Sequence, residues 1–147
     1  MIFGIGVDIA KCSRFEKWLD SQVGSKGGGM IERFFNPAEI LDGGRSQAQD
    51  GASENRTQAQ KSAALQHYAA RFAAKEAFSK ALGCGLAFDL RDAWIQNDAD
   101  GKPELRLQKS AEEALKKRCP QWQAAKILVS LSHEKEYAVA QVAIEIP

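Results

Sequence analysis

The sequence has few cysteines, and no pair of them is spaced for zinc binding or redox chemistry. Cys12, Cys84 and Cys119 lie far apart, an odd set that is typical of a protein kept in a reducing cytosol. No run of about 18 apolar residues occurs, so a membrane-spanning helix is not expected. The first residues have neither the basic region nor the long apolar stretch of a secretory signal. We therefore expect a cytoplasmic protein that has no membrane partner.

An excess of one charge and the common nucleotide-binding motifs are also missing. The chain has 20 Lys plus Arg against 19 Asp plus Glu, so no overall field attracts it to nucleic acid or to an anionic membrane. It contains no Walker loop, no Gly-x-Gly-x-x-Gly opening a helix and no Gly-x-Ser-x-Gly elbow. We expect neither a nucleoside triphosphatase nor a dinucleotide-binding fold, and no nucleic-acid partner. Any phosphate-binding surface must be local.

The rest of the composition is that of one folded domain spanning residues 1–147. Hydrophobic residues make up 44% and charged residues 27% of the 147, close to the averages for globular proteins. Between Gly43 and Ser62 no side chain is both apolar and larger than Ala. Such a stretch cannot bury enough apolar area to offset its ordering entropy, so we expect a mobile surface insertion at about 43–62.

Hydrophobic periodicity and turn residues predict mixed helices and strands. Ile2 to Ile9 is β-branched with Gly4 and Gly6 interleaved, which is typical of a buried strand that something approaches closely. Leu65 to Leu82, followed by Gly83, predicts a long central helix. The other expected elements are a helix from Ser13 to about Val23, a short helix opening at Asn36, a hairpin of Asp92 to Asn97 with Glu104 to Leu107, a helix from Ser110 closed by Pro120, and a hairpin of Ile127 to Leu131 with Tyr137 to Ile146.

Capping boxes and an apolar final strand refine this prediction. Tyr137 to Ile146 is apolar at almost every position, which predicts burial on both faces and suggests that a second subunit provides the cover. Three predicted helix starts have the form of a capping box. They are Ser13 with Glu16, Asn36 with Glu39, and Ser110 with Glu113.

Asp8 stands at the end of an apolar strand, where a carboxylate is costly unless it is hydrogen-bonded, paired or bound to a cation. One interpretation is a helix cap. The other is a functional group, which is favoured because Ser13 and Glu16 already supply a cap.

Glu76 and Lys80 continue an apolar ridge of the central helix in steps of four residues. A surface ion pair, worth roughly 0.3 to 0.5 kcal/mol, would explain them alone. However, the helix also carries Lys75 and ends at Gly83-Cys84-Gly85, so an acid, two bases and an open backbone come together. Because Mg²⁺ commonly uses only one or two protein carboxylates, Asp8 and Glu76 could hold it beside a phosphate.

The two histidines give weaker signals. His67 adjoins the polar stretch and is expected to be a solvated surface group. His133 lies in the turn between the last two strands, and its role stays open.

Several motifs, in order along nearly the whole chain, resemble the holo-acyl-carrier-protein synthase family of bacterial 4′-phosphopantetheinyl transferases. The most specific match is the ungapped run Arg71-Phe-Ala-Ala-Lys-Glu-Ala-Phe-Ser-Lys-Ala-Leu-Gly83. The stretch at 43–62 is longer and more polar than the family pattern. The other matches are Gly4-Ile-Gly-Val-Asp-Ile9 with Arg14, Gly101-Lys-Pro103, Ser130-Leu-Ser-His133 and Tyr137-Ala-Val-Ala140.

The resemblance implies an α+β fold in which an antiparallel sheet packs on a long central helix, assembled as a trimer with active sites between subunits. It implies transfer of the 4′-phosphopantetheine group of coenzyme A to a serine of apo acyl carrier protein, with Mg²⁺ as cofactor, in fatty acid biosynthesis. Two alternatives remain, a non-catalytic carrier-protein or nucleotide-binding module of the same fold and a transferase for a specialised carrier.

The resemblance also implies roles for individual residues. Asp8 and Glu76 would bind Mg²⁺, and Lys80 would meet the phosphate charge, so that these three form the catalytic set. Arg14 would contact the carrier, and either Glu76 or a metal-bound water would deprotonate the serine. The residues implied at the coenzyme A site are Lys80, Gly83, Gly101, Pro103, Ser132 and His133.

Overall fold

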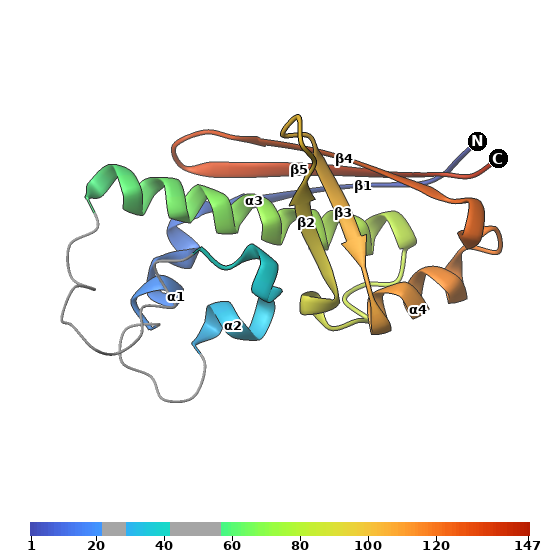
Figure 1. Cartoon of the computed structure of the whole chain (residues 1–147), viewed down its shortest axis with the longest axis horizontal. Helices are drawn as coiled ribbons and strands as arrows, with labels where there is room; N and C mark the ends of the chain where they lie inside the picture. Colours follow the sequence, from blue (N-terminus) through green and yellow to red (C-terminus); the bar gives the residue numbers. More distant parts are fainter. Residues whose placement is uncertain (22–28, 42–56) are drawn as a thin grey trace.

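The computed structural model of the chain describes residues 1–21, 29–41 and 57–147. Its fold is α+β, with a three-stranded antiparallel sheet lying along the long helix α3 and a separate two-stranded hairpin, as the resemblance implied (Figure 1). In chain order the elements are β1 (Ile2–Lys11), η1 (Cys12–Phe15), α1 (Glu16–Asp20), α2 (Met30–Phe34), η2 (Pro37–Glu39), α3 (Gln58–Leu82), η4 (Leu90–Asp92), β2 (Ala93–Asn97), β3 (Pro103–Leu107), α4 (Lys109–Arg118), η5 (Trp122–Ala124), β4 (Lys126–His133) and β5 (Tyr137–Glu145).

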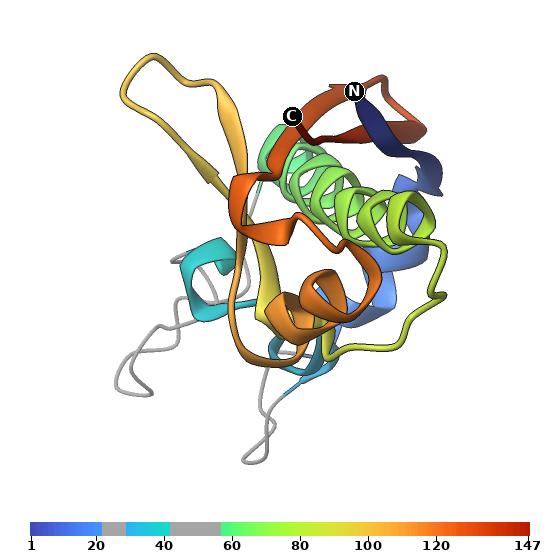
Figure 2. The same cartoon turned by 90° about the vertical axis from the view of Figure 1, so that its right-hand side faces the viewer.

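The three-stranded sheet has the order β1-β5-β4, so the first strand pairs with the last. Asp8 lies opposite Ala140, and Ala140 lies opposite Leu131. Both predicted hairpins, β2 with β3 and β4 with β5, are confirmed. The β2–β3 hairpin projects away from the body of the molecule, whereas the two chain ends lie side by side (Figure 2).

The glycines of β1 allow the strand to lie directly on the backbone of α3. A Cβ atom at Gly4 would come within 2.0 Å of the Ala81 carbonyl oxygen, and one at Gly6 within 2.0 Å of the Ala77 carbonyl oxygen. The prediction that another part of the molecule approaches this strand closely is therefore confirmed. Any larger residue would push β1 and α3 apart.

Helix α3 begins earlier than the predicted start at Leu65. Thr57 caps it, because its Oγ1 accepts a hydrogen bond from the Gln60 N–H (3.2 Å) and its own N–H donates to Gln60 Oε1 (2.9 Å). The end of the expected 43–62 insertion is thus a polar helical turn, and residues 43–56 lie outside the described part of the chain. At the other end Gly83 has φ +63°, which confirms the predicted glycine cap.

Two of the three predicted capping boxes do not form. At Ser13 the reason is that sheet pairing continues too far, since the Cys12 N–H still bonds to the Glu136 carbonyl and Ser13 is already inside η1. At Ser110 the hydroxyl donates instead to Asp92 Oδ2 (2.6 Å). The Asn36 box does form, but the chain becomes extended at Ile40 and the turn stays a short 3-10 helix.

Strand β5 is buried on one face only. Its buried positions are alternate residues that face α3, whereas Gln141 on the other face is exposed. The expected burial on both faces is therefore wrong for the single chain. The outer face of the sheet instead presents apolar side chains that are about half exposed, namely Ile5, Val7, Ile9 and Leu128.

Within the described residues, no helix is both long and apolar enough to cross a membrane.

Candidate active site

Asp8 and Lys80 meet where β1 lies on the second half of α3. Asp8 is opposite the buried Ala140, so its side chain is on the sheet face that covers the helix. The Lys80 Nζ lies 2.7 Å from Asp8 Oδ1 and also donates to the Val7 carbonyl oxygen at 3.1 Å. The Lys80 side chain remains about half exposed, so its charge can also reach a ligand.

Glu76 lies one turn before Lys80 and belongs to the same cluster. Its pKa is raised, first by burial and second by the negative charge of Asp8, while Lys80 and Arg14 oppose the shift. A carboxylate whose pKa is raised by the charge of a neighbouring carboxylate is also stabilised by a cation bound between the two.

This donor set fits Mg²⁺ rather than a metal that needs an all-protein cage. No group of three or more His, Cys, Asp and Glu side chains suited to a metal occurs among the described residues. Mg²⁺ is commonly held by one or two carboxylates, with water and substrate phosphate oxygens completing its shell. Asp8 and Glu76 are such a pair.

Arg14 lies on the same side of the molecule as these carboxylates. Its guanidinium is 4.7 Å from the centre of the Phe72 ring, and Phe72 is one turn before Glu76 on α3. Arg14 is exposed, and stacking on the ring keeps its charge near the cluster without burying it.

The other predicted site residues do not join this cluster within one chain. Ser132 and His133 are exposed at the end of β4, on the opposite edge of the sheet from Asp8. Two strand spacings, or about 9 to 10 Å of backbone, separate the two edges. Gly101 turns the β2–β3 hairpin with φ +84°, and Pro103 begins β3.

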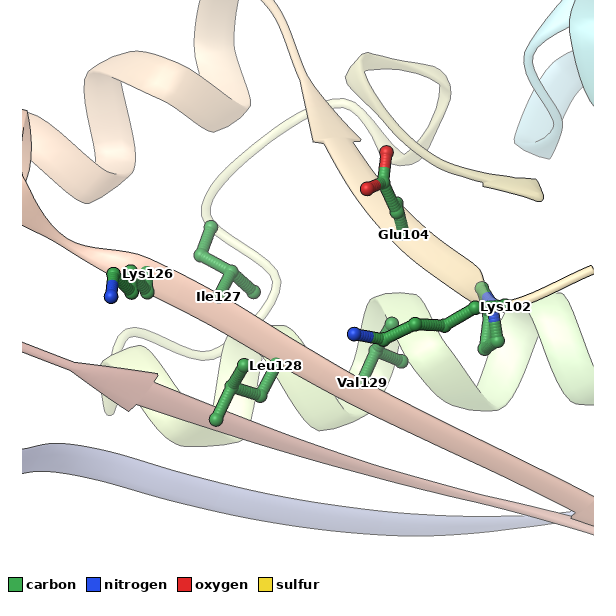
Figure 3. Close-up of a pocket in the computed structure, with 7 residues that line it drawn as sticks. Lys102, Glu104, Lys126, Ile127, Leu128 and Val129 are labelled. Carbon is green, nitrogen blue, oxygen red and sulfur yellow. The ribbon is translucent and has the colours of Figure 1, made fainter. Parts of the chain in front are cut away.

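A pocket of about 360 Å³ lies between the β2–β3 hairpin and β4. The Lys102 side chain extends toward β4 near Val129 (Figure 3). The pocket combines an apolar strand surface with two lysines and one glutamate, so it offers both apolar and charged contacts to a ligand. Its lining residues are Lys102, Pro103, Glu104, Lys126, Ile127, Leu128 and Val129.

Comparison with known proteins shows the family of the chain. The family model described as the 4′-phosphopantetheinyl transferase superfamily matches residues 4–142. The chain belongs to this superfamily. A holo-[acyl-carrier-protein] synthase of Treponema denticola is 42% identical to the chain over 149 residues, covering 99% of each protein.

Solved structures agree with this assignment to the transferase superfamily. A holo-(acyl-carrier-protein) synthase from Bacillus anthracis, in complex with CoA (3′,5′-ADP), aligns with a TM-score of 0.67 and 32% identity, covering 100% of this chain and 99% of that one. An acyl carrier protein synthase from Plasmodium yoelii with ADP bound gives a TM-score of 0.72 and 28% identity, covering 100% and 98%. The resemblance seen in the sequence motifs is confirmed.

Lys75 of this transferase does not serve as a surface base, contrary to the expectation from the helix pattern. It is fully buried, and its Nζ lies 2.6 Å from Glu39 Oε2. Helical spacing could not reveal this, because the partner comes from a distant 3-10 turn. The sequence feature that could have indicated a partner for Lys75 is Glu39, an acidic residue at the third position of a capping box. Glu39 is buried in the structure.

His67 is also not the solvated group that was expected. It is half-buried, with Nε2 2.7 Å from the Glu39 carbonyl oxygen. Burial, reinforced by the nearby Arg71 charge, lowers the pKa of His67 to about 4. The imidazole is therefore neutral near pH 7 and acts in packing.

Proposed function

We propose that this chain transfers the 4′-phosphopantetheine group of coenzyme A to a serine of apo acyl carrier protein, in fatty acid biosynthesis. The observation that carries the proposal is the cluster of Asp8, Glu76 and Lys80 in a member of this superfamily. The name of the Treponema denticola relative and the coenzyme A complex of the Bacillus anthracis protein support the same donor and acceptor.

In the reaction a serine oxygen forms a bond to one pyrophosphate phosphorus, and the bond from that phosphorus to the adenosine-side oxygen breaks. Holo carrier protein and adenosine 3′,5′-bisphosphate are the products. Lys80, half exposed and held by Asp8, is placed to neutralise the phosphate charge. Glu76, whose raised pKa makes it a stronger base than an ordinary carboxylate, can accept the serine proton.

Asp8 and Glu76 would hold Mg²⁺, which when bound neutralises pyrophosphate charge. Because the same carboxylate cannot bind the metal and accept the proton with equal effect, Asp8 is the principal metal ligand in this proposal.

Coenzyme A would bind between two copies of the chain. Gly83 lies at the end of α3 beside the cluster, whereas Gly101, Pro103, Ser132 and His133 are reached from the other edge of the sheet. A neighbouring copy that covers the apolar outer face of the sheet could bring its pocket at β4 to the carboxylate cluster. This geometry supports the trimer with shared active sites.

The carrier protein would dock beside Arg14. Acyl carrier proteins are typically acidic around the modified serine, and an exposed arginine next to the cluster can steer such a partner.

The three cysteines, Cys12, Cys84 and Cys119, are unpaired, which suits the cytoplasmic location proposed here.

The test is to incubate the protein with Mg²⁺, coenzyme A and an apo acyl carrier protein, and to measure the intact mass of the carrier. The proposal expects a gain of one phosphopantetheine group on the serine. Coenzyme A binding without any gain in carrier mass would instead show a non-catalytic module. Modification of a specialised carrier but not of a fatty-acid carrier would overturn the stated acceptor.

A further inference from the structure

A buried ion pair lies directly behind the carboxylate cluster, and the reaction as proposed makes no direct use of it. Lys75 precedes Glu76 on α3, and both Lys75 and its partner Glu39 have fully buried side chains. We propose that the Lys75–Glu39 pair is a positioning device, which fixes the rotation of α3 and thereby holds Glu76 beside Asp8. This inference rests on the proposed function, since it gives the pair a role in that reaction.

All three protons of the Lys75 ammonium group have partners. The Nζ lies 2.6 Å from Glu39 Oε2, 3.0 Å from the Leu90 carbonyl oxygen and 2.5 Å from the Ala93 carbonyl oxygen. These acceptors come from η2, η4 and β2. One side chain therefore ties α3 to three other elements.

The Glu39 carboxylate is held as firmly as the ammonium group. Its Oε1 accepts from the Ile95 N–H at 3.0 Å, and its Oε2 accepts from the Asn36 N–H at 3.1 Å. The pair thus has a fixed anchor that does not depend on α3.

The second anchor of α3 is on the opposite side of the helix. With 3.6 residues per turn, Ala77 and Ala81 lie about 200° and 240° around the axis from Lys75. Their carbonyl oxygens are the atoms against which the β1 glycines pack. Glu76 lies about 100° from Lys75, on the flank between the two anchors.

Two opposed anchors resist rotation better than one. A helix with its side chains has a radius of about 5 to 6 Å, so a rotation of about 15° would move a carboxylate by roughly 1.5 Å. Glu76 would then separate from Asp8, and a misplacement of about 1 Å can cost about 100-fold in rate. An apolar contact in place of the pair would fill the space without setting the angle, whereas three directed hydrogen bonds set it.

The test compares a neutral replacement of the pair with an unrelated core change. In Lys75→Met/Glu39→Gln neither charge of the pair remains, so neither member is left as an unpaired buried charge. The Arg71 guanidinium, which the Glu39 charge also favours, is only partly buried, so the chain can fold. Leu115→Ala, a buried position on α4, is the control for loss of stability. Melting is followed by circular dichroism, and kinetics are measured at temperatures where both variants are folded.

The positioning role predicts that the double variant loses at least about tenfold in kcat, with the KM for coenzyme A changed by less than about twofold. Leu115→Ala should keep its kcat within about twofold. Equal kcat values for the two variants would show that the pair only stabilises the fold, and would overturn the inference.

Hydrogen exchange provides a readout that does not require transfer activity. For each variant, the exchange rate of the backbone amides of residues 74–82 is compared with the rate in the rest of the same protein. This relative rate should be higher in the double variant than in Leu115→Ala. Unchanged protection there would overturn the positioning role even if the enzyme is active. If the wild-type chain transfers nothing, the proposed function fails, while this measurement still decides whether the pair holds α3.

Discussion

The pKa of Glu76 depends on the negative charge of Asp8, which lies in the same cluster. Burial and the Asp8 charge raise the pKa of Glu76, and Lys80 lies within hydrogen-bond distance of Asp8. At this scale the site consists of two carboxylates, Asp8 and Glu76, with two cationic side chains, Lys80 and Arg14, close by. Both a cation and a phosphate therefore meet a group of opposite charge there.

Removing either carboxylate should abolish transfer and leave the fold intact. Asp8→Ala and Glu76→Ala should each lower kcat/KM by at least about 100-fold, since each removes one of the two carboxylates proposed to hold the Mg²⁺ that neutralises phosphate charge. Glu112→Ala, which breaks an exposed ion pair with Lys116 on α4, is the matched control and should change little. Near-normal turnover with Mg²⁺ in either site variant would contradict the assignment.

His67 should make stability fall as the pH drops. Its pKa is about 4 in the folded chain and 6.5 as a free side chain, so between these values only the unfolded chain gains a proton. Between about pH 6.5 and 4 the free energy of unfolding should decrease by at most about 3 kcal/mol, and above pH 6.5 His67 has no effect.

Urea titrations across this range measure the effect. The change in unfolding free energy with pH should be smaller in His67→Gln and unchanged in His133→Gln, whose side chain is exposed. The same dependence in wild type and His67→Gln would mean that folding does not change the pKa of His67, and would contradict the lowered value.

The contact of β1 with α3 sets the geometry of the site at the scale of elements. Gly6→Ala should destabilise the chain by at least about 2 kcal/mol, because the new methyl group would meet the Ala77 carbonyl, which is part of a helix backbone. Gln96→Ala, at an exposed position of β2, should stay within about 0.5 kcal/mol of wild type. Denaturant unfolding compares the two, and equal stabilities would show that α3 does not pack on the glycine.

Most elements could be predicted from the sequence because their signals are local. The alternation of Gly and β-branched residues in β1, the Ala-rich α3 and the turn between β2 and β3 each reflect nearby residues. The failures have non-local causes. Ser13 does not cap because pairing with β5 extends to Lys11, and Ser110 is drawn away by Asp92.

In the candidate site, too, local sequence signals predict some features, and features with non-local causes are missed. Asp8, Glu76 and Lys80 could be grouped from motif and spacing, and the structure brings them together. The burial of Lys75 could not be predicted, because it depends on Glu39, which is 36 positions away along the chain.

At the scale of the whole molecule, the half-exposed apolar face of the sheet is the strongest indication of assembly. Ile5, Val7 and Ile9 are each about 60% exposed and lie on one strand. Val7→Glu should therefore reduce a trimer to monomers, because a buried interface would have to accommodate an unpaired charge. Gln96→Glu on the projecting hairpin is the matched control. Light scattering gives the mass, and a wild type that is monomeric and fully active would contradict the assembly.

The most direct test of the account asks whether one site is shared by two copies of the chain. Asp8→Ala lacks a residue of the β1 edge, and His133→Ala lacks one of the β4 edge, so homogeneous preparations of each should be nearly inactive. Trimers co-assembled from both variants should regain part of the wild-type rate of holo carrier formation, because some sites then combine two intact edges. A mixture with no more activity than the two variants alone would contradict the account.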